Sequence, residues 1–527
     1  MKKLFELFSL SLVLISFTVI NTSCNKEEPI TPKPKGEIPV VSQFVYDGMS
    51  LYYLWAEDMI NKKPTINDTD PKKYFESILY KTDTENNWSW ITDDAKSLVG
   101  GFAGEQFTFG YNLTFVPVNK EQTQFMALVK YVYPNSPAEK AGIKRLDYIG
   151  KVDGSPITGK VTPEGYIEFD NHKLYENNTA TFSIYKLTDN GFEVDREVTI
   201  TPEDINTDPV VFNKIFTIGN KKIGYLFYTS YIANFNYRLH EVFSQFKQEG
   251  VTDLVLDLRY NGGGGIDAAA YLVSLYAPEA DVKNKTTLVK MKYNTFLNEY
   301  FDKRGGRDVA KLGEYREKDE QRGDILYKAA PNPLTANLNL NKIYIIATGN
   351  SASASELTTF CSRAIMGQSN VVHIGGRTYG KYTASWTIHP YDENIGVPIY
   401  TESKLSLELK NTFKNWAMQP IIGIYSDKNE QNFINPGYLE PNYTLREGFG
   451  YVDYWEPLGD PKDVFLGQAL YLITGNESYK PVEPKATRSS KQELQRVLDI
   501  KEDVMPLNLD NIKLTPDDFQ KLRELRK

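Results

Sequence analysis

The sequence predicts a multidomain α/β protein, with a small helical domain near the N-terminus, a β-rich domain and then a larger α/β domain. Three observations predict this organisation. The chain has 527 residues, which is too long for one ordinary domain. Its composition, with 41% hydrophobic and 24% charged residues, is that of globular proteins. The hydrophobic pattern changes along the chain from helical spacing to short β-like runs and then to alternating strands and helices.

Residues 1–24 resemble the signal peptide and lipobox of a bacterial lipoprotein. A short positive segment precedes the apolar run Leu7–Ile20, which is too short to cross a bilayer comfortably as a helix. The letters NTSC then place Cys24 after small residues. We therefore expect lipid on Cys24 and attachment to a membrane without spanning it. The alternative is a simple cleaved signal with an incidental cysteine.

This interpretation places the protein in the bacterial cell envelope, on a periplasmic or surface face, with the outer membrane favoured. Residues 25–42 are polar and proline-rich, which is typical of an extended tether. The net charge of -8 argues against nucleic acid as a partner. Cys24 and Cys361 are the only cysteines, so lipidation of Cys24 excludes an intramolecular disulfide. We expect Cys361 to be a small buried residue.

Residues 43–98 predict the small helical domain. Apolar and aromatic residues recur at helical spacing in FVYDGMSLYYLWAEDMI and DPKKYFESILY. Pro71 directly after Asp70 is typical of a helix start. At the other end of the chain, residues 476–527 are charged and helix-prone, and we expect them to form a peripheral extension.

Residues 105–205 predict the β-rich domain, because short runs of β-branched and aromatic residues alternate with turn signals. The stretch YPNSPAEKAGIKRLDYIGKVDG, Tyr133–Gly154, resembles a PDZ domain, with a serine-capped short helix and a strand that leads to an Asp-Gly turn. The resemblance implies peptide capture by strand addition. The alternative is a PDZ-shaped spacer without a ligand, since fold does not imply function.

Two positions depart from the PDZ pattern. The family usually has glycine before the aspartate, where this chain has Leu146 before Asp147. The carboxylate-binding loop usually reads Gly-x-Gly, and here it is formed by Gly110, Tyr111, Asn112 and Leu113. The resemblance assigns peptide binding to these four loop residues.

Residues 208–475 predict the α/β domain with a largely parallel sheet. Strand-like runs such as VTDLVLDLRYNGGGG and KIYIIATGN alternate with helix-like segments such as NYRLHEVFSQFKQEG and SASELTTFCSRAIM. The carboxyl ends of two of these strands run into glycines or small hydroxyl residues. Such strand-to-helix turns can expose backbone N–H groups that favour developing negative charge.

Three segments of this domain carry candidate chemistry. GNSASASE holds three serines before a helix, and from the pattern alone these serines are either helix caps or a nucleophile with small neighbours. DLRYNGGGG lacks the endings of a P-loop and of a dinucleotide-binding loop, which leaves glycine N–H donors suited to an oxyanion hole. GGRTYGKYTAS presents Lys381 in a loop after a strand.

A serine nucleophile needs a base. The four histidines stand in no triad or metal motif, and His373 lies in an apolar strand where packing is the simpler interpretation; they are His172, His240, His373 and His389. Lys381 is therefore the best candidate base. A free lysine titrates near ~10.4, so we expect burial to lower the pKa of a lysine that works as a base near neutral pH.

The three segments, in this order behind a PDZ-like stretch, resemble the S41 peptidases, the carboxyl-terminal processing or tail-specific proteases. The resemblance implies a crotonase-like α/β serine protease core and no metal or organic cofactor. It makes Ser353 the nucleophile and Lys381 the base. It also implies an oxyanion hole from Ala354 and Gly263. Positions that support the site match Glu356, Thr378 and Ser385. Many members have glutamine at the position of Ser385.

We therefore expect an exported, lipid-anchored serine endopeptidase with a Ser–Lys dyad and an acyl-enzyme intermediate. The partner is a polypeptide substrate, engaged through its C-terminus, and the PDZ-like domain delivers or gates it. One alternative is a noncatalytic peptide-binding lipoprotein on the same fold. A second is an acyl-CoA enzyme, because the S41 core resembles the crotonase fold, although nothing in the sequence indicates a nucleotide site. The sequence does not indicate an oligomeric state.

Overall fold

The structure is a computed structural model. It describes residues 36–483 except 164, 171–172, 177, 189–190, 323–324 and 392–396, together with residues 518, 521, 522 and 524. Cys24, the predicted signal, most of the predicted tether and most of the predicted C-terminal extension lie outside the described residues. Within the described part, no helix is long and apolar enough to span a membrane. The chain divides into two units, Met1–Glu37 and Ile38–Lys527, and the second contains all elements below.

The N-terminal region is helical, as the sequence predicts. Its elements are α1 (Val40–Tyr52), η1 (Ala56–Met59), α2 (Pro71–Ile78), α3 (Lys81–Asn86), β1 (Trp90–Thr92) and α4 (Ala95–Ala103). Asp70 caps α2 by accepting the N–H groups of Lys72 and Lys73, and Pro71 is the first helical residue.

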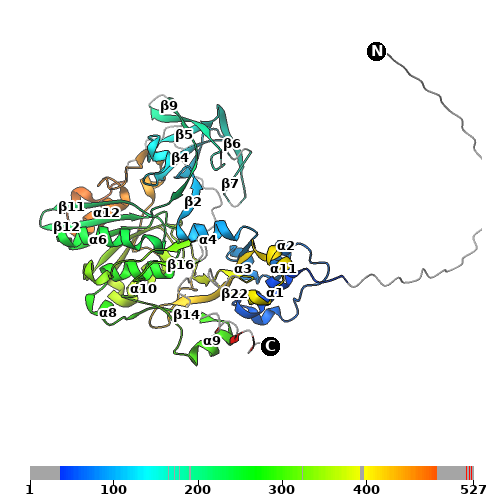
Figure 1. Cartoon of the computed structure of the whole chain (residues 1–527). Coiled ribbons are helices and arrows are strands. Elements are labelled where there is room, and N and C mark those ends of the chain that lie inside the picture. The colour runs from blue at the N-terminus through cyan, green and yellow to red at the C-terminus, as the bar shows by residue number, and fades with distance from the viewer. Residues whose placement is uncertain are drawn as a thin grey trace, which may run out of the picture. The chain divides into compact units, whose positions relative to one another are not determined.

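This N-terminal region packs against segments from late in the chain. Strand β1 pairs antiparallel with β23 (Ala417–Gln419), and α1 lies beside α11 (Leu407–Phe413) and β22 (Val397–Pro398) in Figure 1. Phe44 of α1 contacts Phe413 of α11, and the Tyr400 hydroxyl donates to Asp47. The N-terminal helices therefore share one hydrophobic core with the α/β region.

The β-rich region is a seven-stranded sheet in the order β3-β4-β6-β5-β8-β9, with β7 on β6. Its strands are β3 (Tyr111–Pro117), β4 (Gln124–Val132), β5 (Tyr148–Val152), β6 (Ser155–Val161), β7 (Ile167–Phe169), β8 (Ala180–Thr188) and β9 (Gly191–Ile200). The short helix α5 (Pro137–Lys140) begins after Ser136, whose Oγ accepts the N–H of Glu139. This sheet has a hydrophobic core of its own, built around residues such as Phe115 and Phe182.

Two short strands mark where the chain enters and leaves this sheet. They are β2 (Glu105–Thr108) and β10 (Glu203–Asn206), which pair antiparallel.

The α/β region is built on a six-stranded sheet in the order β11-β12-β13-β18-β19-β25. Its strands are β11 (Val210–Ile218), β12 (Lys221–Tyr228), β13 (Asp253–Asp257), β18 (Ile343–Ala347), β19 (Val371–Gly375) and β25 (Tyr443–Thr444). All neighbours pair parallel except β11 with β12, so the predicted, largely parallel sheet is confirmed. The loops that follow β13 and β18 leave the same edge of the sheet.

Helices cover both faces of this sheet, because alternate strand residues point to opposite sides. Leu256 and Ile345 pack with α6 (Asn236–Glu249), α7 (Ile266–Tyr276) and α10 (Ala354–Met366). Val255 and Ile346 pack with α12 (Val464–Thr474) on the other face. These two apolar layers hold the strand ends that carry the candidate site.

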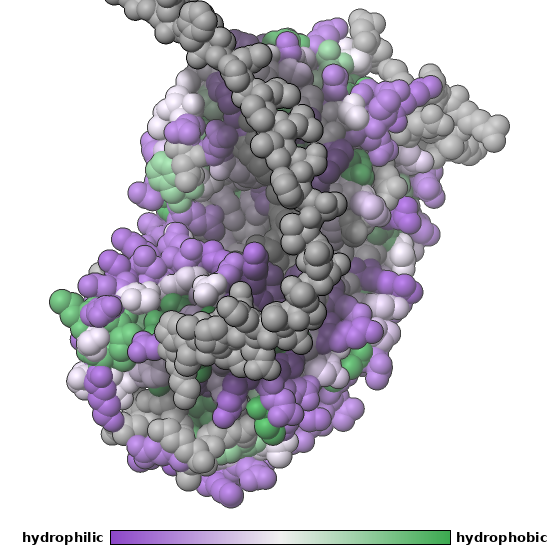
Figure 2. All heavy atoms as spheres, turned by 90° about the vertical axis from the view of Figure 1, so that its right-hand side faces the viewer, coloured by the Kyte–Doolittle hydropathy of each residue, from purple (hydrophilic) through white to green (hydrophobic). Residues whose placement is uncertain are grey.

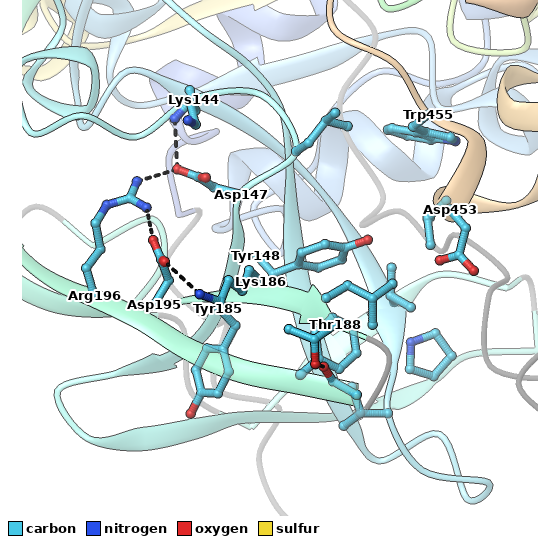
Figure 3. Close-up of a pocket in the computed structure, with 18 residues that line it drawn as sticks. Lys144, Asp147, Tyr148, Tyr185, Lys186, Thr188, Asp195, Arg196, Asp453 and Trp455 are labelled. Atoms are coloured by element: carbon cyan, nitrogen blue, oxygen red, sulfur yellow. Dashed lines mark hydrogen bonds and ion pairs between the residues drawn. The ribbon is translucent and has the colours of Figure 1, made fainter.

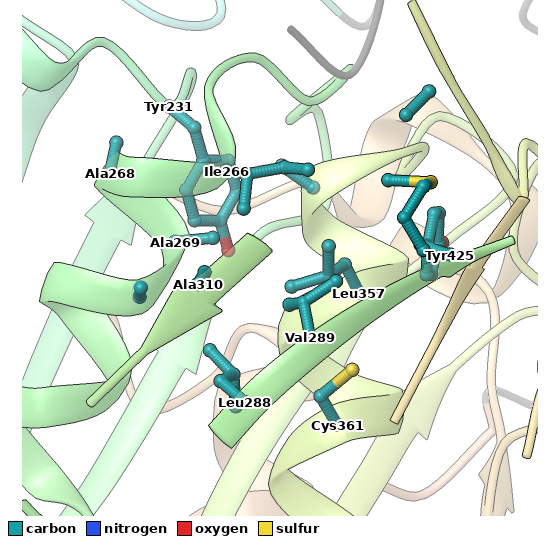
Figure 4. Close-up of a cluster of buried hydrophobic side chains, with 14 of the residues drawn as sticks. Tyr231, Ile266, Ala268, Ala269, Leu288, Val289, Ala310, Leu357, Cys361 and Tyr425 are labelled. Atoms are coloured by element: carbon teal, nitrogen blue, oxygen red, sulfur yellow. The ribbon is translucent and has the colours of Figure 1, made fainter. Parts of the chain in front are cut away.

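A second, antiparallel sheet lies beyond α10. Its order is β15-β14-β24-β20, with β14 (Thr287–Tyr293), β15 (Asp308–Lys311), β20 (Thr383–Ser385) and β24 (Ile421–Ser426). Figure 4 shows Leu357 and Cys361 of α10 among Leu288, Val289 and Tyr425 of this sheet. Cys361 is fully buried there, as the sequence predicts for a small core residue.

Smaller elements complete the described part of the chain. Strand β21 (Ile388–His389) joins β1, β22 and β23 in a sheet, and β16 (Glu320–Arg322) pairs with β17 (Ile325–Tyr327). The remaining helices include α8 (Glu279–Lys283) and α9 (Thr295–Asp302). Hydrophilic side chains predominate on the face shown in Figure 2, with hydrophobic ones in separate groups. This surface is ordinary for a globular protein.

Candidate active site

Ser353 lies between β18 and α10 in a strained conformation. Its φ is 56° and its ψ is -111°, in a region that residues other than glycine rarely occupy. Ala352 and Ala354 on either side are fully buried. A Cβ added to Gly263 would lie 2.7 Å from the Ser353 Cβ. Glycine is thus required at position 263, because the two loops touch at this point.

The three serines of this loop have different surroundings. Ser351 Oγ donates to the carbonyl of Leu258 at 2.7 Å, and Ser355 Oγ donates to the carbonyl of Asn261 at 2.8 Å. Both side chains therefore bind the serine loop to the loop after β13. Ser353 Oγ is buried and has no hydrogen-bond partner among the described residues. Of the three, only the Ser353 hydroxyl is left uncommitted for a reaction.

The fully buried carboxylate of Glu356 joins the serine loop to the lysine loop. It accepts the N–H of Ser353 at 2.9 Å, that of Gly380 at 2.8 Å and that of Lys381 at 2.8 Å. It also accepts from Thr378 Oγ1, which in turn receives the N–H of Leu439. Burial raises the pKa of Glu356 and these donated hydrogen bonds oppose the rise. Because every partner donates, the arrangement fits the ionised carboxylate.

Lys381 is buried, with 1% of its surface exposed. The Tyr425 hydroxyl lies 3.3 Å from both the Ser353 carbonyl and the Lys381 carbonyl, so it bridges the same two residues as Glu356. Since Ser353 Oγ has no hydrogen-bond partner among the described residues, the bond to Lys381 Nζ is not formed in this structure. Catalytic hydrogen bonds are often long without substrate and shorten in the reacting complex.

The predicted oxyanion-hole residues lie together beside Ser353. Ala354 is the first residue of α10, where N–H groups have no partner within a helix. A Cβ on Gly263 would lie 3.2 Å from the Ala354 nitrogen. The Gly263 N–H donates to Asn261 Oδ1 at 2.9 Å. The Gly263 N–H must therefore leave Asn261 before it can face an oxyanion.

Two family models match the chain over these regions. Residues 222–424 match the model for Peptidase family S41, and residues 41–90 match the model for the Peptidase S41 N-terminal domain. Over these residues the chain matches peptidase family S41. The S41 match spans the loops of Gly263, Ser353 and Lys381.

Curated relatives and a solved structure agree with the S41 assignment. A CtpA-like serine protease of Staphylococcus haemolyticus (strain JCSC1435) is 24% identical over 68% of this chain and 60% of its own length. A CtpA-like serine protease of Staphylococcus aureus (strain bovine RF122 / ET3-1) is 26% identical over 57% of this chain and 51% of its own length. The chain thus spans about half to three fifths of these relatives.

The solved structure is that of an S41 protease from Bacteroides fragilis NCTC 9343. It matches with a TM-score of 0.60 and 24% identity, over 84% of this chain and 99% of that one. This likeness confirms the S41 protease fold.

Ser385, which stands where many S41 members have glutamine, has a glutamine as its neighbour. Gln419 of β23 donates from Nε2 to Ser385 Oγ at 3.2 Å, and both side chains are fully buried. Gln419 Oε1 has no hydrogen-bond partner among the described residues. The amide of Gln419 thus lies beside Ser385 from another strand. The sequence gives no signal for this contact, because the two residues are 34 positions apart.

A buried ionic network around Arg259 holds the loop that leads to Gly263. Arg259 pairs with Asp257, Asp463 and Glu447 at 2.6, 2.7 and 2.8 Å. Burial acts to raise the pKa of Asp463, but the charge and hydrogen bonds of Arg259 outweigh it and the pKa is lowered. The Arg259 carbonyl also accepts from Thr348 of the serine loop. The network therefore supports the loops on both sides of Ser353.

The same network reaches the β-rich region. Arg145 pairs with Glu447 at 2.7 Å and donates to the Tyr260 hydroxyl at 3.2 Å. The next residue, Leu146, has a φ of 75°, in the left-handed region that favours the glycine usual at this PDZ position.

The predicted peptide-binding loop lies where β3 begins. Gly110 has a φ of 86°, and a Cβ there would lie 2.2 Å from that of Ser136, so glycine is required. Tyr111 and Leu113 are buried in the core of the sheet, and Asn112 stands at a register shift between β3 and β4. Strand β3 is the end strand of this sheet among the described residues, and six of its seven residues are buried.

A cavity of about 1080 Å³ lies elsewhere on the β-rich region (Figure 3). Its lining includes Leu146, Tyr148 and Phe192 of the sheet, and Trp455 from far along the chain. Residues 110–113 do not line it. The structure therefore separates this cavity from the predicted peptide-binding loop.

His373 is a packed core residue and not a base. It is fully buried on β19, and burial lowers the pKa of its imidazole to about 4. No group of acidic, histidine or cysteine side chains that could hold a metal ion occurs among the described residues.

Proposed function

We propose that this S41-family chain is a serine endopeptidase in which Ser353 is the nucleophile and Lys381 the general base. The observation that carries the proposal is the geometry of Ser353. The residue is strained, buried among small neighbours and free at Oγ, and the Glu356 carboxylate ties its backbone to that of Lys381. A strained serine at a strand-to-helix turn is typical of a nucleophile elbow.

The reaction follows from the residues around Ser353. Neutral Lys381 takes the Oγ proton as Oγ bonds to the scissile carbonyl carbon, and the carbonyl oxygen becomes an oxyanion. The N–H groups of Ala354 and Gly263 stabilise that charge. The lysine then gives its proton to the leaving amine, which departs and leaves an acyl ester on Ser353. Water, deprotonated by Lys381, hydrolyses the ester.

We assign a crotonase-like architecture to the α/β core and a PDZ-like role to the β-rich region. The position of β3 at the end of its sheet and the required glycine at position 110 support capture of an extended polypeptide, by its C-terminus, through strand addition. The buried Arg145–Glu447 pair supports delivery or gating, because both residues also bond the hydroxyl of Tyr260, which lies in the loop of Gly263.

We also propose that the chain is exported and anchored by lipid on Cys24, on the periplasmic or surface face of the bacterial outer membrane. The apolar segment Leu7–Ile20 followed by the NTSC letters supports this. Intact-mass analysis of the mature protein checks it: we expect a chain that begins at an acylated Cys24.

The decisive experiment compares the soluble chain from residue 36 onward with its Ser353→Ala variant on an unfolded protein substrate. We expect Ser353→Ala to abolish hydrolysis with little change in melting temperature. Ser362→Ala is the matched control, since Ser362 is a buried serine of the same helix that bonds Tyr276 instead. Hydrolysis that persists in Ser353→Ala contradicts the proposal. Peptide binding without any hydrolysis by the unmodified protein favours the noncatalytic alternative.

A further inference from the structure

The segment from Asp83 to Trp90 of the N-terminal region lies against the strands around Lys381. Ser89 Oγ accepts the N–H of Ile421 on β24 at 2.8 Å. The ring of Trp88 packs edge-on against that of Tyr382, the residue after Lys381, with centroids 5.2 Å apart. Trp90 pairs with Gln419 in the β1–β23 ladder. Contacts from three consecutive residues thus hold this segment against β23, β24 and Tyr382, which follows Lys381.

Asp83 is the carboxylate of this segment, and it is fully buried. Its Oδ2 accepts from the Tyr53 hydroxyl at 2.6 Å and from Ser89 Oγ at 2.5 Å, and its Oδ1 accepts the Ser89 N–H at 2.8 Å. The Tyr53 hydroxyl accepts the N–H of Tyr80, and the Ser89 hydroxyl accepts the N–H of Ile421. Each hydroxyl therefore donates its own hydrogen to Asp83. Asp83 therefore only accepts hydrogen bonds, as an ionised carboxylate does.

The charge of Lys381 acts on Asp83. Burial raises the pKa of Asp83, its three hydrogen bonds oppose the rise, and Lys381 also opposes it. Both side chains are buried, so water and salt screen their attraction only weakly.

We propose that Asp83 is a positioning residue for catalysis, which stabilises the positive charge that Lys381 gains when it takes the proton of Ser353. This inference rests on the proposed function. It makes the N-terminal region part of the active site, because the region supplies a second carboxylate beside that of Glu356, which the α/β core provides. The Asp83 carboxylate has two opposing effects on the reaction rate. It stabilises the charged lysine that forms during acylation, which raises the rate. It also shifts loss of the lysine proton to higher pH, which leaves less neutral lysine to act as a base.

Other titratable groups also face Lys381. Glu356 receives the Lys381 N–H from α10, Tyr425 of β24 contacts the Lys381 carbonyl, and Tyr53 stands behind Asp83. Glu356 is held by four donors, and burial raises the pKa of both tyrosines far above neutrality. A change at Asp83 alone is therefore the way to isolate its charge.

The experiment measures the pH at which Lys381 loses its proton in the unmodified chain and in Asp83→Asn. The probe is the ¹³Cε NMR signal of Lys381 in lysine-labelled protein, identified by its absence in Lys381→Met. We expect the midpoint to fall by about one pH unit in Asp83→Asn, because a favourable buried charge is removed. We also expect the acid limb of the pH–rate profile to shift with it, and the plateau rate at high pH to fall about tenfold.

Two further variants keep the result decisive. Asp83→Ser removes the same charge with a smaller side chain, in case the amide disturbs folding. Asp47→Asn is the matched control, since Asp47 is a hydrogen-bonded carboxylate of the same region that binds Gln43 and Tyr400. A midpoint that stays within ~0.2 pH units of the unmodified value in a folded, neutral Asp83 variant overturns the inference. A rate loss without a pH shift does so too, because a purely structural role predicts that result.

The two proposals fail in different ways. If the unmodified chain shows no Ser353-dependent hydrolysis while the NMR midpoint still depends on Asp83, the proposed function falls and the charge coupling stands. If hydrolysis depends on Ser353 while the NMR midpoint of Lys381 is the same in the Asp83 variants, only the inference about Asp83 is contradicted.

Discussion

Two buried polar clusters meet at the loops around Ser353, and they are built differently. The Glu356 cluster has one anion, Glu356, which accepts from Ser353, Thr378, Gly380 and Lys381. The Arg259 cluster has two cations and three anions, namely Arg145 and Arg259 with Asp257, Glu447 and Asp463. The first fixes the reacting groups by hydrogen bonds to the backbone. The second fixes the loops beneath them by charge.

The difference indicates a division of labour. Neutral donors around Glu356 leave the Ser353 hydroxyl uncommitted, so the cluster can position a nucleophile without consuming it. The Arg259 cluster has no uncommitted nucleophile, and its ion pairs join residues up to 302 positions apart. We therefore expect damage to the first cluster to affect activity most and damage to the second to affect stability most.

The largest effect is expected from Lys381→Arg. Arginine keeps the positive charge but stays protonated, so it cannot take the Ser353 proton. We expect activity to fall by about 10³-fold or more, as in Lys381→Ala, with the chain still folded. Hydrolysis of an unfolded protein measures the loss, with Lys290→Arg as a control on a partly exposed lysine. Full activity in Lys381→Arg would show that another group takes the proton, and the dyad would have to be withdrawn.

Arg259→Met should have the next largest effect, and on stability. It leaves Asp257 and Asp463 buried without their cation, which costs about 3–5 kcal/mol of unfolding free energy. Urea unfolding measures the change. The control is Arg377→Met, which breaks an exposed ion pair and should cost less than ~1 kcal/mol.

The matching change in the first cluster is Glu356→Gln. It keeps the shape of the side chain and turns one acceptor into a donor. We expect a smaller loss of stability than in Arg259→Met and a larger loss of hydrolysis. A larger loss of stability in Glu356→Gln and a larger loss of hydrolysis in Arg259→Met would contradict the proposed difference between the two clusters.

His373 extends the comparison to a buried group whose pKa is set mainly by burial. Its Nε2 lies 3.2 Å from the Ala347 carbonyl, and its Nδ1 has no hydrogen-bond partner among the described residues. Its pKa is lowered by burial from 6.5 to about 4. Between these two pH values the imidazole is mostly protonated in the unfolded chain and mostly neutral in the folded chain. Stability should therefore fall as the pH drops from 6.5 to 4, by about 3 kcal/mol from this group.

The measurement is the difference in urea midpoint between the unmodified chain and His373→Gln across that pH range. The variant should lose less stability on acidification, because glutamine does not titrate. Parallel pH curves for the two proteins would contradict the lowered pKa.

How far the sequence predicts the site depends on where each partner lies in the chain. Local chemistry in the sequence indicates the serine loop and Lys381 as candidates, whereas the choice of Ser353 among three serines and the supporting role of Glu356 come from the resemblance to S41 peptidases. The helical N-terminal region and the largely parallel sheet follow from periodicity. Asp83 and Gln419 carry no local signal, because Lys381 and Ser385, the residues on which they act, lie far from them in the sequence.

The strained backbone shows the same limit. Leu146 stands in the sequence where PDZ domains usually have glycine, but only the structure shows that its φ is 75°. Arg145, one position earlier, has partners near position 447 that no spacing rule connects to it.

The smallest effects should come from exchanging the amide and the hydroxyl at Ser385 and Gln419. Ser385→Gln adds a second amide beside Gln419 in a fully buried space, which should cost about 1–3 kcal/mol by overpacking. Ser385→Leu should cost more, because it also leaves Gln419 Nε2 without its acceptor. In the double variant Ser385→Gln with Gln419→Ser, one amide and one hydroxyl again share the space, so part of the lost stability and rate should return. Losses that simply add in the double variant would show that the two positions do not act together. Gln419 would then be a packing residue, and the lysine loop would depend on Glu356 and Tyr425 alone.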